Sequence, residues 1–363
     1  MTSSDFGRVT QLDGIRTIAV GMVIVAHSGL SWLVPGGFGV TIFFFLSGFL
    51  ITSLLRSENA RDGTISLSDF YIRRVLRIMP PLYITLVFCW IIVQLKLVSG
   101  QPLIALSVFS QFTFFVNYAS IWGDPLGYGG LPITSVWSLA VEEHYYLVFP
   151  VFYLVFLRKL SPRDQIMICL MVCALALAFR FLNVAMLQDY TVNYRWTHTR
   201  IDSIMLGAGL ALYGNPVMDK AAWRPNGWYA LTAVAMIGLS LAVRDPIFRE
   251  TVRYSIQNAS LYVLFAYALS NEGWVAQALS SSISKAIARY SYTLYLVHSP
   301  MFGIFEKVEF LPHIVAVALA LASSWIFADL MFRLVERPLA QWRRNAVHRR
   351  MMNPKHQPHA QGQ

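Results

Sequence analysis

Apolar residues along this chain gather in long runs, separated by short polar segments that hold most of the charges. Such runs predict helices, and the longer ones approach the roughly 20 residues that a helix needs to cross the hydrocarbon core of a bilayer. We therefore expect an all-α, polytopic integral membrane protein built as a helical bundle. The eleven apolar stretches are 17–34, 37–55, 80–98, 103–121, 137–157, 166–182, 201–213, 228–243, 254–269, 290–305 and 313–335.

The distribution of Lys and Arg predicts which stretches cross the membrane. Basic residues concentrate in segment 56–77 and in the tail after Val335, so we expect both on the cytoplasmic side. An odd number of crossings would separate them, so one stretch does not cross. We assign this role to 103–121, which holds Gln111 and Asn117, as a re-entrant or interfacial segment. The result is about ten transmembrane helices with both termini cytoplasmic. It leaves Arg244, Arg249 and Arg253 outside, partly balanced by Asp245 and Glu250.

Composition supports this class of protein. Hydrophobic residues make up 56% of the 363 residues and charged residues 13%, whereas soluble domains carry about 25% charged residues. Cytoplasmic loops explain the net charge of +10, so we expect no nucleic-acid partner. Cys89, Cys169 and Cys173 lie in apolar runs without the spacing of a metal site, so we expect neither disulfides nor a metal. We divide the chain into a transmembrane domain, 1–340, and a basic, disordered cytoplasmic tail, 341–363.

Two ionisable residues mark the first apolar stretch: one directly precedes it and one lies within it. Arg16 and His27 are eleven positions apart, which brings them to nearly the same helix face and separates them by roughly 16 Å along the axis. Ionisable groups within a membrane are costly unless they face a cavity or a partner, so they indicate a functional site. We expect Arg16 to hold an anion at the inner membrane surface, and His27 to act as general base just past the middle of the membrane. The alternative for His27 is a polar contact between helices.

An acidic pair is expected at the depth of His27. Trp137 suits the outer membrane interface, which puts Glu142 and Glu143 roughly 8 Å below it, near the imidazole. A carboxylate beside an imidazole can fix its tautomer and favour its protonated form. Adjacent carboxylates point about 100° apart on a helix, so we expect one of them to face His27, and we favour Glu142.

Three arginines gather in a basic segment that follows the second apolar stretch. The run 68–80 begins with capping residues and predicts a short amphipathic helix that the closing Pro-Pro pair terminates. Spacings of three and four residues let the guanidinium groups of Arg73, Arg74 and Arg77 converge on phosphate. Together with Arg16 at the same surface, they predict a cytoplasmic site for a polyphosphate donor. A site for lipid headgroups is the alternative.

Six motifs follow one another along the chain, from Leu12 to Pro338, and cover nearly its whole length. They are Leu12-Asp13-Gly14-Ile15-Arg16 with His27, 39–51, Phe70-Tyr71-x-x-Arg74-x-x-Arg77-Ile78-x-Pro80, Trp137-Ser138-Leu139-x-Val141-Glu142-Glu143, Tyr292-x-x-Tyr295-Leu296-x-His298, and Glu336-Arg337-Pro338. Together these motifs resemble those of the acyltransferase-3 family of membrane O-acyltransferases. The chain departs from the family where His144 and Tyr145 follow the two Glu residues, since the family commonly has Gln and an aromatic residue there.

The resemblance implies an acyltransferase that moves an acyl group, usually acetyl from acetyl-CoA as co-substrate, to a hydroxyl of a cell-surface or exported glycan or a related acceptor. We expect it in the bacterial cytoplasmic (inner) membrane, surrounded by membrane lipids, without the extracytoplasmic hydrolase-like domain that some relatives carry. The expected catalytic residues are His27, Arg16, Glu142 and Glu143. The expected acyl-CoA contacts are Arg73, Arg74, Arg77 and Arg16.

The acceptor, a glycan or lipid-linked saccharide, is expected to contact Ser47, Trp137, Tyr83 and His298. Ser47 and Gly48 form a small pair that allows close helix packing, so packing or acceptor orientation is preferred to a nucleophilic role for the serine. His298 is expected mid-span as a second polar wall of the cavity. His27 either deprotonates the acceptor hydroxyl or briefly carries the acyl group, and direct transfer is preferred. The alternative function is a transporter or flippase for a lipid-linked saccharide.

Overall fold

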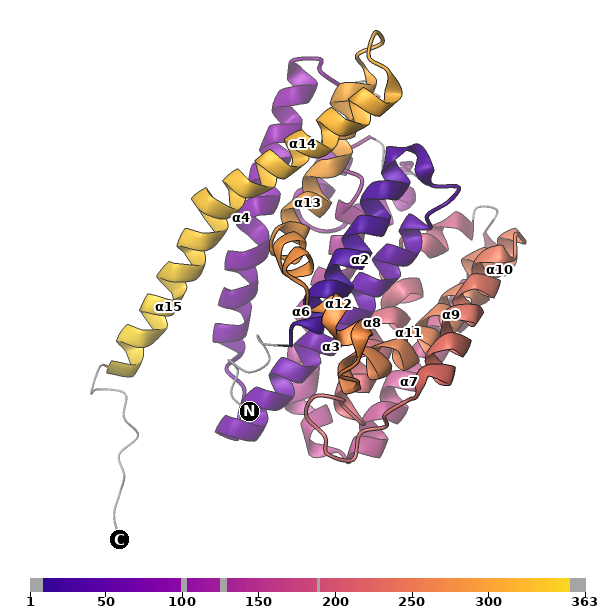
Figure 1. Cartoon of the computed structure of the whole chain (residues 1–363), viewed down its shortest axis with the longest axis vertical. Coiled ribbons are helices and arrows are strands. Elements are labelled where there is room, and N and C mark those ends of the chain that lie inside the picture. Colours follow the sequence, from indigo (N-terminus) through magenta and orange to yellow (C-terminus); the bar gives the residue numbers. More distant parts are fainter. Residues whose placement is uncertain (1–8, 99–102, 125–128, 188–189, 353–363) are drawn as a thin grey trace.

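The computed structural model describes residues 9–98, 103–124, 129–187 and 190–352, which form a bundle of helices (Figure 1). These residues contain no strand, which confirms the all-α prediction. The long helices pack side by side, with their ends gathered at two opposite ends of the bundle. The position of a residue along its helix therefore sets its depth within the bundle.

Two long helices form the centre of the bundle. Helix α3, Gly36–Asp62, packs along α8, Thr197–Leu212, and α2, Gln11–Val25, lies against α3. The backbones of α3 and α8 approach very closely, because a Cβ atom added at Gly48 would lie 1.8 Å from the Ile204 carbonyl oxygen. The predicted close packing at the Gly48 position is confirmed.

The other helices surround this centre (Figure 1). Helix α6, Val136–Val155, packs against both α3 and α8. On one side of the centre lie α7, Pro162–Met186, α9, Gly227–Ala242, α10, Pro246–Glu250, and α11, Val252–Ser270. Those on the other side are α4, Leu67–Gln94, α12, Trp274–Leu279, α13, Ser282–Glu306, and α14, His313–Met331.

The C-terminal helices form one long rod beside α4 (Figure 1). Helix α14 continues through a π-helical turn, η5, Phe332–Glu336, into α15, Arg337–Met352. The sequence predicts a disordered tail over 341–363. The first part of that tail is helical in α15, and residues 353–363 lie outside the described residues.

Helix α4 does not end at its two prolines, so the predicted short helix is wrong. It begins after the capping residue Ser66 and continues through Pro80 and Pro81. Each proline removes one backbone donor, which weakens the helix at this turn. This turn is tied to a neighbouring helix, because the Tyr292 hydroxyl of α13 donates a 2.9 Å hydrogen bond to the Ile78 carbonyl oxygen.

Five helical segments are long and apolar enough to cross a membrane. The remaining helices are shorter or carry more polar residues. The predicted integral membrane class is supported, and the count of ten spans stays a prediction. The five segments are Gly36–Asp62, Leu67–Gln94, Val136–Lys159, Pro162–Met186 and His313–Asn345.

The apolar stretch 103–121 forms no long helix. It contains the short helix α5, Ala105–Phe112, and a 3-10 helix, η2, Val116–Trp122. Eight residues of α-helix rise only about 12 Å, far less than the roughly 30 Å of a membrane core. This stretch therefore lacks a helix that could cross the membrane, in agreement with the segment predicted not to cross.

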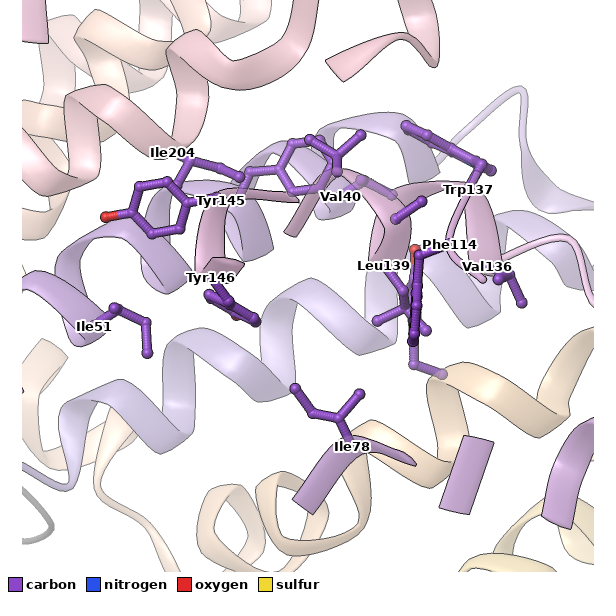
Figure 2. Packing of buried hydrophobic residues seen from close by; sticks show 14 of the residues in the cluster. Val40, Ile51, Ile78, Phe114, Val136, Trp137, Leu139, Tyr145, Tyr146 and Ile204 are labelled. Carbon is purple, nitrogen blue, oxygen red and sulfur yellow. The ribbon is translucent and has the colours of Figure 1, made fainter. Parts of the chain in front are cut away.

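A large apolar core joins α6 to the centre of the bundle (Figure 2). Tyr145 and Leu139 of α6 pack with Ile51 of α3 and Ile204 of α8, and all four side chains are buried. Lipid tails are as apolar as these side chains, so the stabilisation comes from close packing rather than from leaving water. The core therefore fixes the rotation of α6, on which several candidate site residues lie.

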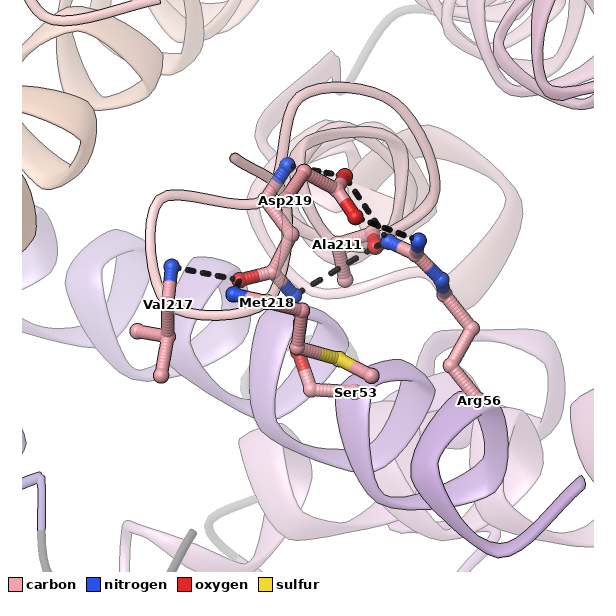
Figure 3. A network of polar contacts seen from close by, with 7 residues as sticks. Ser53, Arg56, Ala211, Val217, Met218 and Asp219 are labelled. Carbon is pink, nitrogen blue, oxygen red and sulfur yellow. Dashed lines mark hydrogen bonds and ion pairs between the residues drawn. The ribbon is translucent and has the colours of Figure 1, made fainter. Parts of the chain in front are cut away.

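Polar contacts fix the loop between α8 and α9 (Figure 3). Arg56 of α3 forms an ion pair with Asp219, with a 2.7 Å separation between Nη2 and Oδ1, and donates to the Ala211 carbonyl oxygen. Asn215 donates a 2.9 Å hydrogen bond to Ser53. The loop is thereby tied to the end of α3.

Candidate active site

His27 lies where helix α2 ends. The α-helix passes into one π-helical turn, η1, Ala26–Leu30, in which Gly29 takes a φ of 91°. The imidazole Nδ1 lies 2.8 Å from the Val23 carbonyl oxygen. Because a carbonyl can only accept a hydrogen bond, Nδ1 carries the hydrogen of the neutral ring, and the lone pair of that ring is on Nε2. The ring is exposed, so the unprotonated nitrogen suits a general base.

His27 faces a cavity of about 910 Å³, which we call the histidine chamber. Its size falls in the range of small-molecule sites, and Trp137 forms part of its wall. The chamber can therefore hold a polar molecule of several rings beside the imidazole. Its other polar side chains are Lys96, Gln111, Thr134, Arg195, Ser299, Glu306 and Lys307.

His298 of α13 is the second imidazole at this place. Its side chain is fully buried, and its ring centroid lies 4.9 Å from that of His27, with the rings 75° apart. Its Nδ1 bonds to the Leu294 carbonyl oxygen at 3.1 Å, so this nitrogen also carries the hydrogen. Its buried Nε2 has no hydrogen-bond partner among the described residues. The structure thus brings His298 into contact with the predicted base.

Three arginines converge on a smaller cavity of about 90 Å³, which we call the arginine chamber. Arg16 comes from α2, and Arg74 and Arg77 come from α4. The positive charges of the two α4 side chains act on the Arg16 guanidinium, while Asp13 lies 3.5 Å from it. Like charges gathered in a protein interior favour an anion among them. The structure therefore brings together three of the four arginines that the sequence assigns to one anion site.

Glu142 belongs to the arginine chamber and does not pair with His27, so the predicted pair is wrong. The Tyr146 hydroxyl lies 2.9 Å from Glu142 Oε2, to which it donates, and 3.0 Å from Ser47 Oγ. Glu143 lies beside this group and interacts electrostatically with Glu142. Among the described residues, no hydrogen bond or ion pair joins either carboxylate to the imidazole.

The position of Trp137 explains why Glu142 does not lie at the predicted depth, beside His27. The sequence places its side chain at the outer membrane interface, whereas the structure buries it, 9% exposed, with its ring 4.7 Å from that of Tyr194. The 3-10 helix η2 packs against α6, and the first residues of α6 are buried, so α6 begins inside the protein. Five residues of helix carry the chain about 7.5 Å further, which brings Glu142 level with the arginines instead of His27.

Tyr295 stands between the two chambers. It lines the arginine chamber, and its ring centroid lies 6.0 Å from that of His298. Its hydroxyl oxygen lies 2.6 Å from Ser138 Oγ, and Phe43 packs against its ring at 5.5 Å. The chambers share no lining residue among those described. Tyr295 is therefore a side chain of the arginine chamber that lies toward the two histidines.

The arginine chamber adjoins a basic cavity beside α15. This cavity, of about 560 Å³, shares Arg77 with the arginine chamber, and Glu336 is the acidic residue among those lining it. The basic surface therefore extends from α4 onto helices that no sequence motif had assigned to it. Its other arginines are Arg289, Arg337, Arg343 and Arg344.

Four of the predicted site residues line neither chamber: Glu143 and His298 contact residues that do, so His298 is not the predicted wall of the cavity, whereas Arg73 and Tyr83 make their contacts elsewhere. Arg73 forms a 3.1 Å ion pair with Glu58, and its side chain is 41% exposed. Adjacent helix positions point about 100° apart, so Arg73 does not face the chamber together with its neighbour Arg74. Tyr83 stacks on Phe112 of α5 and donates to its carbonyl oxygen at 3.3 Å. Neither side chain lines the chambers.

The hydroxyl groups that join the site have no role predicted from the sequence, although Tyr295 and Ser138 lie within two of the six motifs. Tyr146 could have been found, because it lies one helical turn after Glu142 and so on the same face of α6. Tyr295 likewise lies three positions before His298 on α13. The contact between Tyr295 and Ser138 joins segments far apart in the chain, and no local pattern predicts it.

These features define an integral membrane protein with polar cavities inside its helical bundle. A family model described as an acyltransferase domain matches residues 9–333, and the chain belongs to this acyltransferase-3 family. The family predicted from the six motifs is confirmed, and with it the enzyme class, an acyltransferase. No solved structure matches the chain.

Two curated relatives show what the chain is similar to. The peptidoglycan O-acetyltransferase OatA of Listeria monocytogenes is 28% identical over 353 residues, which cover 91% of this chain and 56% of the relative. The O-acetyltransferase OatA of Staphylococcus aureus is 27% identical over 371 residues, which cover 93% of this chain and 60% of the relative. The chain therefore spans little more than half the length of these relatives.

Proposed function

We propose that this chain transfers an acyl group, most simply acetyl, from acyl-CoA to a hydroxyl of a cell-envelope glycan. The observation that carries the proposal is the placement of His27, whose unprotonated Nε2 faces a cavity large enough for sugar rings. The relatives' names support acetyl as the transferred group and peptidoglycan as an example of the acceptor.

The arginines form the donor side in this proposal. CoA carries phosphate groups, which guanidinium groups bind through charge-assisted hydrogen bonds. The basic cavity beside α15 receives the phosphates, and the pantetheine arm enters the arginine chamber past Arg77, which lines both cavities. Arg16 and Arg74 flank the arm, and Glu142 holds Tyr146 in place beside it.

Transfer requires one proton movement and one new carbon–oxygen bond. His27 Nε2 takes the proton of the acceptor hydroxyl as its oxygen attacks the thioester carbonyl carbon. The carbon–sulfur bond then breaks, the CoA thiolate receives the proton, and the acyl ester remains on the glycan. Movement of Tyr295 admits the thioester from the arginine chamber. Direct transfer is preferred to an acyl-histidine, because it needs no second chemical step after the thioester arrives.

The proposed location is the bacterial cytoplasmic membrane, with both termini cytoplasmic and the histidine chamber facing outward. This orientation exposes the basic cavity beside α15 to acyl-CoA in the cytoplasm. It also follows the excess of Lys and Arg in segment 56–77 and after Val335. Ten spans, with 103–121 as a re-entrant or interfacial segment, remain part of this proposal.

Label transfer in vesicles tests the proposal. The purified chain is reconstituted with acetyl-CoA labelled in the acetyl group and with soluble peptidoglycan strands, and label on the strands is measured. We expect His27→Ala to reduce transfer by roughly 10²-fold to 10⁴-fold. His313→Ala is the matched control, because this exposed histidine contacts the Ser28 carbonyl oxygen and lines neither chamber.

Two results would count against the proposal. Equal transfer by the wild-type chain and His27→Ala would show that the imidazole is not the base. Absence of transfer to any glycan in the wild-type chain would overturn acyl transfer to glycans. Movement of a labelled lipid-linked saccharide across the same vesicles would then establish transport instead.

A further inference from the structure

A further cavity opens beside the histidine chamber. This cavity, which we call the side pocket, has a volume of about 650 Å³ and is lined by residues of α3, α9, α10 and α11 and of the loop after η1. Arg195 lines both cavities. Tyr194 of the side pocket also packs on Trp137 of the histidine chamber, with ring centroids 4.7 Å apart. The two cavities therefore share a wall.

The side pocket carries a surplus of positive charge. Four arginines line it, and Glu250 is the acidic residue among its lining residues. Glu250 lies 3.8 Å from Arg253 and compensates its charge. In the described part of the chain, no ion pair involves Arg244 or Arg249, both of which are exposed in the pocket. Two guanidinium groups are thus available to an anion.

The arginines of the side pocket are exceptions to the positive-inside rule, by which Lys and Arg concentrate on the cytoplasmic side of membrane proteins. In the proposed orientation the side pocket faces outward with the histidine chamber, on the side where Lys and Arg are depleted. Topology therefore does not explain Arg244, Arg249 and Arg253, and electrostatic compensation within the chain explains only the last of them. A ligand with negative charge explains all three.

Three further features suit an anion carried by a saccharide. Helix α3 begins at Gly36 in the pocket wall, and Pro35 provides no side-chain cap for its first N–H groups, which attract anions. The buried Arg200 guanidinium lies 3.9 Å from the ring centroid of Tyr254, another wall residue, and adds to the positive potential. Trp32 in the wall is 76% exposed and offers an aromatic face to the apolar face of a sugar ring.

We propose that the side pocket binds an acidic group, a carboxylate or a phosphate, of the same acceptor saccharide whose hydroxyl enters the histidine chamber. This inference rests on the proposed function and adds the acceptor's charge to it. Because the two cavities share a wall at Arg195, an anion held in one fixes which hydroxyl reaches His27 in the other. The side pocket thereby selects anionic acceptors.

Two probes and one double variant test the inference. The probes are a soluble peptidoglycan tetrasaccharide with free carboxylates and the same tetrasaccharide with its carboxylates converted to methyl amides. We expect the wild-type chain to use the carboxylate probe at least roughly tenfold better in kcat/KM, as for hydrogen bonds to charged groups. Arg244→Gln/Arg249→Gln raises KM for the carboxylate probe to that for the amide and leaves kcat unchanged. Lys220→Gln/Arg224→Gln, which removes two charges from the loop before α9, is the matched control.

The other possible results count against either the inference or the proposed function. Equal effects of the double variant on both probes, or none on either, would overturn the inference. A difference confined to nanodiscs that contain anionic lipid would assign the arginines to a lipid headgroup and would also overturn it. If the wild-type chain acetylates neither probe, the proposed function fails. Calorimetric binding of the carboxylate probe to the wild-type chain and to the double variant then decides the inference separately.

Discussion

The imidazole rings of His27 and His298 meet edge to face, with their centroids 4.9 Å apart. His298 is fully buried, and its hydrogen bond to the Leu294 carbonyl oxygen fixes its ring. The exposed ring of His27 therefore rests against an immobile one. Through this contact, helix α13 near the end of the chain orients the proposed base on helix α2.

We expect His298→Ala to lower kcat roughly 100-fold with little change in either KM, because small displacements of a reacting group have large kinetic costs. His298→Phe separates the two contributions of this side chain. If the ring edge alone positions His27, the Phe variant recovers most of the wild-type kcat. If a ring nitrogen of His298 is needed, the kcat of the Phe variant stays as low as that of the Ala variant. Wild-type kcat in both variants would show that His298 has no positioning role.

Arg73 and Arg74 form a matched pair of neighbours with different surroundings. Arg74 lines the arginine chamber, whereas Arg73 is paired with Glu58 outside it. Loss of a charge-assisted contact costs roughly tenfold or more in affinity, so we expect Arg74→Gln to raise KM for acetyl-CoA by at least that factor. Arg73→Gln should change this KM less than about twofold, as for a surface ion pair. Steady-state kinetics with varied acetyl-CoA measure both, and equal effects would contradict the assignment of the chamber to the donor.

Sequence patterns predicted which helices pack closely better than they predicted how deep each residue lies in the bundle. The small pair Ser47-Gly48 predicted a close helix contact, because only small side chains let two backbones touch, and the structure confirms it at Gly48. Depth was harder to predict. Trp137 resembles an interface residue in the sequence, but the structure buries it against Tyr194, and this contact depends on the tertiary fold.

The contacts of the candidate site also fall into some that the sequence predicts and some that it does not. The convergence of Arg16, Arg74 and Arg77 follows from helix periodicity and a common membrane surface, so it could be predicted. The exclusion of Arg73 depends on Glu58, fifteen residues earlier, and the contact of His27 with His298 joins α2 to α13. Such contacts between distant segments have no signature in local spacing.

Tyr295 should prevent loss of the acyl group to water. Its side chain lines the arginine chamber, contacts the ring of His298 and is held by Ser138. We expect Tyr295→Ala to connect the chambers and to raise the release of free CoA from acetyl-CoA without an acceptor by roughly tenfold, because closed sites exclude water from reactive intermediates. Tyr83→Ala is the control, since this tyrosine contacts Phe112 instead. Thiol release without acceptor measures both, and an unchanged rate in Tyr295→Ala would contradict a barrier at this side chain.

The closeness of α3 and α8 gives a prediction about stability. A Cβ atom at Gly48 would lie 1.8 Å from the Ile204 carbonyl oxygen, and one at Gly207 would lie 2.0 Å from the Phe45 carbonyl oxygen. Both obstacles are backbone atoms, so Gly48→Ala must push the two central helices apart. We expect a loss of about 3 kcal/mol or more in the free energy of unfolding, as for overpacked cores, and a fall of several degrees in the unfolding temperature in detergent.

Gly238→Ala is the matched control, because no heavy atom lies within 4 Å of its added Cβ atom. Replacing a helical glycine with alanine at such an open position should raise the unfolding temperature slightly, since alanine favours the helix by roughly 1 kcal/mol. The two substitutions are chemically identical, so a difference in sign isolates the contact between α3 and α8. Equal unfolding temperatures would show that this contact is looser than its backbone geometry indicates. Because α3 carries Ser47 and α8 packs on α6, which carries Glu142, Gly48→Ala should also weaken acyl-CoA binding before it unfolds the protein.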